Sequence, residues 1–254
     1  MQFKDHFSSH SPDYAKYRPR YPAALFEYLA SMTPEHERAW DCATGNGQAA
    51  LSLAPFFAQV IATDASQSQL DSAPPHEKIS YRVAAAEQTD IEAASVNLVT
   101  VAQALHWFDL EAFYREVKRV LKPAGVLAVW AYNLLEIEPS IDAKVNEFYG
   151  LTVGPYWPPE RRLIEDGYRS IVFPFEELKP PPVRMEASWR LSDLVGYLQT
   201  WSATKRFIAA RGFDPVPALA NELLPVWGAT NEEKRVYWPL SLRVGVVPRM
   251  NGSR

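Results

Sequence analysis

The sequence predicts an α/β fold, in which helices cover both faces of a mostly parallel sheet of seven strands. Between residues 36 and 133, short apolar segments alternate with helical segments, a pattern typical of parallel strands joined by crossover helices. After residue 133 this alternation stops. Two strand-like segments in the later region, PVRMEASW and RVYWPLSLRVGVV, are predicted to form an antiparallel pair that closes one edge of the sheet.

The chain begins with an arm that is crowded with tyrosine, basic residues and proline, DYAKYRPRYP. We expect this arm to be a cap or lid rather than a strand. In the next segment, PAALFEYLASM, apolar residues recur at helical spacing and a proline stands in the first turn, which predicts a short amphipathic helix. Residues 1–35 are therefore assigned to an N-terminal cap.

Five strands are predicted to follow, in RAWD, QVIATD, ISYRVAA, VNLVTVAQAL and GVLAVWAY. The segment DLEAFYREVKRVLK, before the fifth strand, places Phe113, Val117 and Val120 on one face and its charges on the other. This pattern predicts an amphipathic helix that ends before Gly125. Further helices are expected near residues 191–211, between the two strands of the closing pair.

The composition narrows the function classes. A chain of 254 residues with 47% apolar and 22% charged residues suits one large α/β domain or two small ones. The net charge of −4, from 26 basic and 30 acidic residues, disfavours nucleic acid as a partner. A single cysteine cannot form an internal disulfide, and no apolar run approaches the about 20 residues of a membrane-spanning helix. We therefore expect a cytoplasmic protein with no membrane partner.

A glycine pair follows the predicted first strand, in the segment AWDCATGNGQAAL. A strand that ends at Asp41 and turns through Gly45 and Gly47 into a helix brings backbone amides to the carboxyl edge of the sheet, where open α/β sheets bind ligands. Asp64 ends the next strand, close to the spacing of about 20 residues expected for an acid that holds ribose hydroxyls. The two features together predict an adenosine-containing ligand, and a tight turn without a ligand is the alternative.

Five segments resemble the successive motifs of class I S-adenosylmethionine-dependent methyltransferases: WDCATGNGQAA, VIATDASQSQL, AAAEQTD, VTVAQALHWFD and REVKRVLKPAGVLAVW. The arm segment YAKYRPRYP is similar to one in the small-molecule, type 11 branch that includes trans-aconitate methyltransferase. The resemblance covers about residues 10–133, and more loosely the rest. It implies a Rossmann-like methyltransferase domain over residues 36–254, with a cofactor-binding core at 36–133 and a substrate-side, sheet-closing region at 134–254.

The same resemblance implies S-adenosyl-L-methionine as the cofactor and S-adenosyl-L-homocysteine as the product. Asp41, Gly45 and Gly47 would line the methionine portion, and Asp64 would hold the ribose. The other implied contacts are Tyr14 and Arg18 from the arm, Ala65 against the ribose, Ala86 and Glu87 beside the adenine, and Gln103 under the sulfonium. Ala43 also lies on the cofactor loop, at a position where the family usually has glycine, and its methyl group puts the cofactor affinity in question.

Methyl transfer from a sulfonium depends on alignment, which alone can be worth about 7–11 kcal/mol. A carboxylate acceptor needs no base, whereas a hydroxyl or an amine benefits from one. His106, in ALHWFD after the fourth strand, is the candidate base; alternatively, it orders the loop or packs on Trp107. The candidate substrate contacts are Trp107, Tyr156 and Trp157. Arg161 and Arg162 could meet a carboxylate, or they could form a solvated helix start.

The acceptor is expected to be a small molecule, and a carboxylic acid is one candidate. The ALHWFD stretch lacks the Asn or Asp followed by Pro-Pro and an aromatic residue that marks the enzymes of this fold that methylate nucleic acid amines. The histidines show no metal-ligand spacing, so no metal is expected. Two alternatives stay open: an NAD-dependent oxidoreductase, weakened by the lack of a third glycine, and a non-catalytic metabolite- or partner-binding protein. The oligomeric state and the accepting atom are left open.

Overall fold

The computed structural model describes residue 17 and residues 19–247, and it confirms the α/β fold. The parallel strands are β1 (Arg38–Cys42), β2 (Gln59–Asp64), β3 (Ile79–Val83), β4 (Val96–Ala102) and β5 (Leu121–Tyr132). The antiparallel strands are β6 (Glu176–Leu178), β7 (Arg184–Trp189) and β8 (Lys234–Val246). The sheet order is β3-β2-β1-β4-β5-β8-β6, and β7 also pairs with β8.

The closing pair forms as predicted, but the sheet has eight strands rather than seven. The long strand β8 pairs with β7 along its first half, and with β5 and β6 along its second half. The additional strand, β6, was missed because its three residues, EEL, include two exposed glutamates and are too short to show an alternating pattern.

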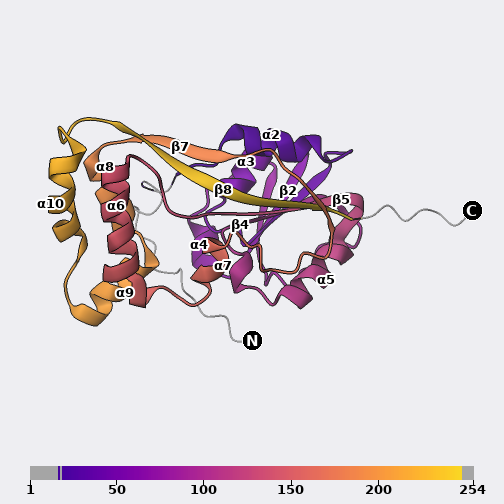
Figure 1. Ribbon diagram of the computed structural model, residues 1–254. Coiled ribbons are helices and arrows are strands. Elements are labelled where there is room, and N and C mark those ends of the chain that lie inside the picture. The colour runs from indigo at the N-terminus through magenta and orange to yellow at the C-terminus, as the bar shows by residue number, and fades with distance from the viewer. Residues whose placement is uncertain (1–16, 18, 248–254) are drawn as a thin grey trace, which may run out of the picture.

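Helices flank the sheet and extend beyond one end of it (Figure 1). Those next to the sheet are α2 (Ala23–Ser31), α3 (Gln48–Leu53), α4 (Gln67–Asp71), the short η1 (Leu105–Trp107) and α5 (Leu110–Val120). The later ones are α6 (Pro139–Glu147), η2 (Phe148–Thr152), η3 (Gly154–Tyr156), α7 (Arg161–Glu165), α8 (Leu191–Gln199), α9 (Ser202–Arg211) and α10 (Val216–Trp227). Figure 1 shows α6, α8, α9 and α10 gathered beyond the carboxyl ends of the parallel strands, where they form a helical lid region.

The apolar core divides into layers on the two faces of the sheet. Val99 of β4 points to the face covered by α5, and its neighbour Leu98 points to the face covered by α2 and α3. A third cluster fills the helical lid region around Trp238 of β8. The α5 helix is capped by Asp109, whose side chain accepts a hydrogen bond from the Ala112 amide. The two amphipathic helices predicted from the sequence, α2 and α5, are therefore confirmed, and each buries apolar side chains.

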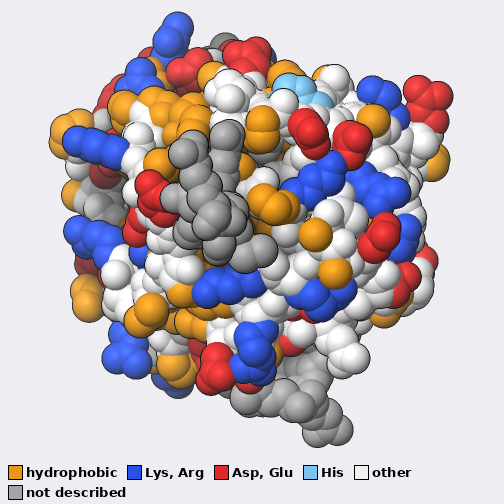
Figure 2. Space-filling view, turned by 90° about the vertical axis from the view of Figure 1, so that its right-hand side faces the viewer, with side chains coloured by type: hydrophobic (Ala, Val, Ile, Leu, Met, Phe, Trp, Pro, Cys, Tyr) orange, Lys and Arg blue, Asp and Glu red, His pale blue; other side chains and the backbone are white. Residues whose placement is uncertain are grey.

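The amino ends of the parallel strands carry paired charges. Lys122 forms ion pairs with Glu35 and Glu37, and Arg38 lies 3.6 Å from Glu92. On the face shown in Figure 2, basic and acidic side chains are interspersed, in agreement with the nearly balanced composition. Within the part of the chain that the structure describes, no helix combines the length and the apolar character needed to cross a membrane.

Candidate active site

The predicted ligand residues meet at the carboxyl edge of three neighbouring strands. β1 lies between β2 and β4 with parallel pairing on both sides. Asp41 is the penultimate residue of β1, and its Cα partner on β4 is Thr100. Asp64 is the last residue of β2. The topology therefore brings both acidic residues to one edge, as the sequence pattern predicts.

Asp41 is buried, with 1% of its surface exposed, and both carboxylate oxygens accept hydrogen bonds. Thr100 Oγ1 donates to Oδ1 at 2.7 Å, and Thr44 Oγ1 donates to Oδ2 at 2.6 Å. Burial raises the pKa of Asp41 to about 6, and the hydroxyl donors partly oppose this rise. The side chain thus joins β4 to the beginning of the glycine loop.

The loop between β1 and α3 bends through left-handed backbone conformations. Ala43, Gly45 and Gly47 have φ values of 53°, 57° and 81°. The φ of Gly47 favours glycine, and a Cβ atom there would also lie 2.6 Å from the hydroxyl oxygen of Tyr81, which would have to move. Ala43 adopts a conformation that favours glycine, so the departure noted in the sequence carries backbone strain.

Asp64 ties the glycine loop to the loop after β2. Its Oδ2 accepts a hydrogen bond from the Gly45 amide at 2.9 Å, and its Oδ1 accepts one from the Ser66 amide at 2.9 Å. Ala65, between these segments, is half-buried. The carboxylate therefore has a defined orientation at the edge.

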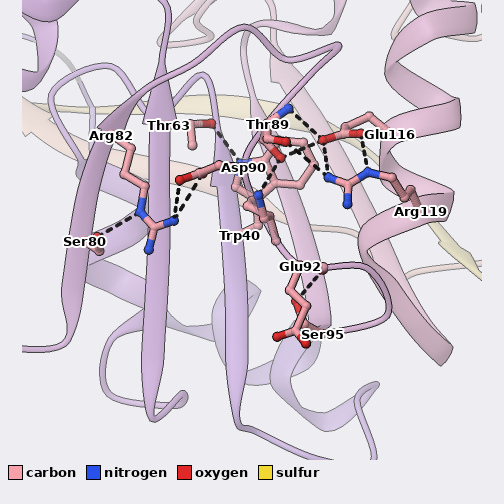
Figure 3. Close-up of polar contacts among 11 residues, drawn as sticks. Trp40, Thr63, Ser80, Arg82, Thr89, Asp90, Glu92, Ser95, Glu116 and Arg119 are labelled. Carbon is pink, nitrogen blue, oxygen red and sulfur yellow. Dashed lines mark hydrogen bonds and ion pairs between the residues drawn. The ribbon is translucent and has the colours of Figure 1, made fainter.

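The loop after β3 is fixed from both sides (Figure 3). Glu116 of α5, whose side chain is 7% exposed, accepts from the Thr89 amide at 2.8 Å and from Thr89 Oγ1 at 2.6 Å, and it pairs with Arg119 at 2.7 Å. On the other side, Arg82 of β3 donates to Asp90 at 3.2 Å. These contacts hold the segment that carries the predicted adenine contacts.

The two predicted adenine contacts lie within this fixed segment. Ala86 is buried, and Glu87 is half-buried. Oε1 of Glu87 accepts a hydrogen bond from the Asp109 amide at 3.0 Å, which links the segment to the N-terminus of α5. The sequence did not single out Glu116, because an acidic residue within an amphipathic helix is ordinarily assigned to the solvent face.

Gln103 lies between the carboxyl ends of β4 and β5. Its φ is 59°, its amide donates to the Trp130 carbonyl at 2.9 Å, and its Nε2 donates to the Tyr132 carbonyl at 3.4 Å. The strained turn directs the chain from β4 into η1. The side chain is therefore held at the edge where the resemblance implies that the sulfonium lies.

His106 is buried in η1, with 9% of its surface exposed. Its Nδ1 lies 2.9 Å from the hydroxyl of Tyr168, and its ring contacts that of Trp107 with centroids 4.6 Å apart. Burial, with a smaller contribution from the charge of Arg161, lowers the pKa of His106 to about 3. The imidazole is therefore neutral at neutral pH.

Arg161, at the beginning of α7, is half-buried among aromatic and amide groups. Its Nε donates to the Tyr149 hydroxyl and its Nη2 donates to Asn133 Oδ1, both at 2.9 Å. The guanidinium lies 4.8 Å from the ring centroid of Trp157. Arg162, by contrast, is exposed and donates to a backbone carbonyl. Only the second arginine matches a solvated helix start.

The other predicted aromatic contacts separate in the structure. Trp157 packs with Tyr149, their ring centroids 5.0 Å apart, next to Arg161. Tyr156 turns toward α9, where its ring contacts Phe207 and its hydroxyl accepts from Arg211 at 2.9 Å. Trp157 therefore lies beside Arg161, whereas Tyr156 packs within the helical lid region.

Two described residues of the arm, Tyr17 and Pro19, lie against helices α8 and α3. Gln48, the first residue of α3, donates to the Pro19 carbonyl at 3.0 Å. Gly196 of α8 faces the ring of Tyr17, and a Cβ atom there would come within 2.5 Å of it. The two predicted arm contacts, Tyr14 and Arg18, lie outside the described residues.

Three side chains at this edge were not anticipated: Asn133, Tyr149 and Tyr168. Asn133 directly follows β5, so the argument that placed Asp41 and Asp64 could have found it. Tyr149 and Tyr168 come from the irregular region after β5, where neither spacing nor periodicity distinguishes them from other aromatic residues.

Comparisons with known proteins agree with this geometry. Residues 40–129 match the type 11 methyltransferase domain family. A Dictyostelium discoideum protein provisionally named a methyltransferase is 37% identical over 239 residues, which cover 92% of this chain and 91% of that protein. The solved structure of a protein from Anaeromyxobacter dehalogenans, provisionally described as a type II methyltransferase, superposes with a TM-score of 0.86 at 42% identity, covering 91% of this chain and 98% of that one.

A third relative matches over a shorter region. The Saccharomyces cerevisiae protein CRG1, provisionally described as an S-adenosylmethionine-dependent methyltransferase, is 30% identical over 131 residues. The match covers 48% of this chain and 45% of the yeast protein, so the chain spans less than half of the length of that relative.

Proposed function

This chain belongs to the class I S-adenosylmethionine-dependent methyltransferases, and on that premise we propose that it transfers a methyl group from S-adenosyl-L-methionine to a small-molecule acceptor. Family membership argues against the oxidoreductase alternative. The observation that supports the proposed site best is the bond network in which Asp41 and Asp64 fix the glycine loop at the sheet edge. The carboxylic acid acceptor, the cytoplasmic location and the trans-aconitate methyltransferase-like branch stay predictions.

The residues at this edge fit the cofactor. Among the described residues, a side chain at Gly45 would meet only Gln69, at 3.7 Å, so the backbone of the loop is open to a ligand. The Asp64 carboxylate is a suitable acceptor for ribose hydroxyls, since an ionised carboxylate offers about four acceptor sites. The apolar Ala86 lies in the fixed segment after β3, beside which we assign the adenine. We assign the methionine portion to the loop from Asp41 to Gly47, and the sulfonium to the neighbourhood of Gln103.

When bound, S-adenosyl-L-methionine supplies a methyl group on an already activated sulfonium. The protein therefore has to hold the acceptor in line and to exclude water. Trp107 and Trp157 can form walls of such a space. His106 is a weak proton acceptor, because the pKa of its imidazole is about 3. These properties favour an acceptor with no proton to lose, such as a carboxylate.

Isothermal titration of the purified protein with S-adenosylmethionine, S-adenosylhomocysteine and NAD tests the proposal. We expect both sulfur nucleosides to bind and NAD not to bind. Formation of S-adenosylhomocysteine in the presence of carboxylic acids, and its absence with matched neutral esters, would support the acceptor class. Binding of NAD alone would contradict the assignment of the site.

A further inference from the structure

We propose that Arg161 is the specificity-determining residue for the acceptor, and that it anchors a carboxylate of an organic acid beside the methyl-transfer site. This inference rests on the proposed function and deepens it. It starts from three neutral groups that surround one guanidinium: Asn133, Tyr149 and Trp157.

These three groups hold the guanidinium in a fixed orientation without neutralising it. Tyr149 and Asn133 each accept one hydrogen bond, and Trp157 lies against the guanidinium plane. The Tyr149 hydroxyl in turn donates to Glu165, an exposed residue on the far side of the phenol. Burial raises the pKa of Tyr149 to about 12, so this phenol stays protonated at neutral pH.

Arg161 differs from two other half-buried arginines, Arg82 and Arg243, which have acidic partners. Arg82 pairs with Asp90 at 3.2 Å, and Arg243 pairs with Glu177 at 2.8 Å. Within the described ranges, 17 and 19–247, no carboxylate lies within ion-pair distance of Arg161, and Nη1 has no hydrogen bond. A half-buried guanidinium with no carboxylate at ion-pair distance is a favourable partner for a carboxylate ligand, which it can bind through two parallel hydrogen bonds.

The position of Arg161 connects it to the methyl-transfer site. Its partner Asn133 follows Tyr132, whose carbonyl accepts the side-chain amide of Gln103. Its charge also reaches His106 in η1, where it contributes to the lowered pKa. A carboxylate bound at Arg161 therefore places the rest of a small acceptor against the carboxyl ends of β4 and β5.

A carboxylate that binds Arg161 anchors the acceptor and is not the group that receives the methyl. A carboxylate bound by a guanidinium has its negative charge drawn into hydrogen bonds, which lowers its nucleophilicity. The group at Arg161 is therefore the anchor, and the methylated atom lies elsewhere in the acceptor. The substrate class is an organic acid with a carboxylate in addition to its nucleophilic group.

The test measures binding and turnover separately. Protein saturated with S-adenosylhomocysteine is titrated calorimetrically with succinate, glutarate and citrate, and with the uncharged diamides of succinate and glutarate. The wild type should bind at least one acid and none of the diamides. Arg161→Gln should bind that acid about tenfold to hundredfold more weakly, because hydrogen bonds to a charged group are lost. Arg161→Lys should retain part of the affinity, and the exposed control Arg162→Gln should match the wild type.

The affinity for S-adenosylhomocysteine is the internal reference. If it is unchanged in Arg161→Gln while the KM of the acid rises, the effect belongs to the acceptor site. Equal binding of the acid to the wild type and Arg161→Gln would overturn the inference, as would equal binding of acids and diamides to the wild type. Failure of the wild type to bind either sulfur nucleoside would instead contradict the proposed function. The comparison of acids with diamides needs no variant, so it can overturn the inference even if Arg161→Gln does not fold, and Arg161→Lys then tests the residue itself.

Discussion

The backbone amide of Gly45 donates a 2.9 Å hydrogen bond to the carboxylate of Asp64, which lies 19 residues further along the chain. The same carboxylate accepts from the Ser66 amide at 2.9 Å. One side chain therefore fixes the loop after β1 against the loop after β2. Asp64 therefore shapes the glycine loop, in addition to the ribose contact that we assign to it.

Replacing Asp64 should affect affinity and stability together. Asp64→Ala removes the acceptor of two backbone donors and of the ribose hydroxyls, so we expect S-adenosylhomocysteine to bind about a hundredfold more weakly and the free energy of unfolding to fall by about 1–3 kcal/mol. Asp64→Asn keeps one oxygen acceptor and should lose less of both. Calorimetry and urea denaturation measure the two effects. Unchanged affinity in a destabilised Asp64→Ala protein would leave Asp64 with a structural role alone.

In Ala43→Gly, two opposing effects on the free energy of unfolding should nearly cancel: the backbone strain at residue 43 is relieved, and the chain loses more conformational entropy on folding. The φ of 53° at Ala43 costs about 1 kcal/mol in a non-glycine residue, whereas glycine loses about 0.5–1 kcal/mol more conformational entropy on folding. We therefore expect the free energy of unfolding to change by less than about 1 kcal/mol, and cofactor affinity to rise as the methyl is removed. Ala43→Val, with a branched side chain at positive φ, should lower stability. Weaker cofactor binding by Ala43→Gly would show that the methyl contributes a favourable contact.

Much of the candidate site at the carboxyl edge of the sheet could be predicted, because its residues follow short apolar strands that are visible in the local sequence. Asp41 is the penultimate residue of one apolar strand and Asp64 is the last residue of the next, and parallel strands bring their carboxyl ends to one edge whatever the rest of the chain does. The pairing of the two late strands could also be predicted. By contrast, β6 consists of three residues that pair only because β8 extends past them, which no local pattern reveals.

Arg161 and Glu116 show where sequence patterns stop being informative. Arg161 and Arg162 are adjacent in the chain, yet one is tethered by Asn133, 28 residues away, and the other is exposed. Glu116 is buried because the segment containing Thr89 covers it. Burial of a charged side chain depends on distant segments, so the sequence indicates the residue type but not its environment.

Glu116→Gln should weaken S-adenosylhomocysteine binding indirectly, through the segment that contains Thr89. Because Glu116 holds Thr89 and pairs with Arg119, its loss should loosen the segment that carries Ala86 and reduce S-adenosylhomocysteine affinity about threefold to tenfold. The free energy of unfolding should fall by about 1–2 kcal/mol. Glu111→Gln, which breaks an exposed pair with Arg115 on the same helix, is the matched control and should change stability by less than about 0.5 kcal/mol. Equal behaviour of the two variants would contradict the positioning role.

The effect of Glu116 should also depend on pH. Burial raises the pKa of Glu116, but the hydrogen bonds from Arg119 and Thr89 outweigh it and hold the pKa below its ordinary value of 4.5. The ionised carboxylate therefore stabilises the fold above that value, and this stabilisation is lost as the pH falls through the lowered pKa. The stability difference between wild type and Glu116→Gln, measured by urea denaturation at pH 7 and below pH 4, should shrink in acid. A constant difference would mean that the charge of Glu116 is not what holds the segment.

The free energy of unfolding should depend less on pH in His106→Asn than in the wild type. Burial first, and then the charge of Arg161, lower the pKa of His106 from 6.5 to about 3. Between these values the unfolded chain binds a proton that the folded protein does not, so the neutral imidazole contributes stability above pH 6.5 that is progressively lost as the pH falls. From pH 7 to pH 5 this loss amounts to about 2 kcal/mol. Urea denaturation of the wild type should show the loss, and His106→Asn should lack it.

The same variant examines the role of His106 in turnover. A residue with a pKa of about 3 produces no ionisation between pH 6 and pH 8, so His106 should contribute no limb to the kcat/KM profile of an acid acceptor over that range. A limb near pH 6 that arises from Asp41, whose pKa is about 6, should persist in His106→Asn. His106→Asn should reduce kcat/KM without changing the shape of the profile, because the smaller side chain loses the ring contact with Trp107. His76→Asn, at an exposed histidine, provides the control for both measurements. A wild-type limb near pH 6–7 that disappears in His106→Asn would instead identify His106 as the proton acceptor, and would require an acceptor that loses a proton, such as a hydroxyl or an amine.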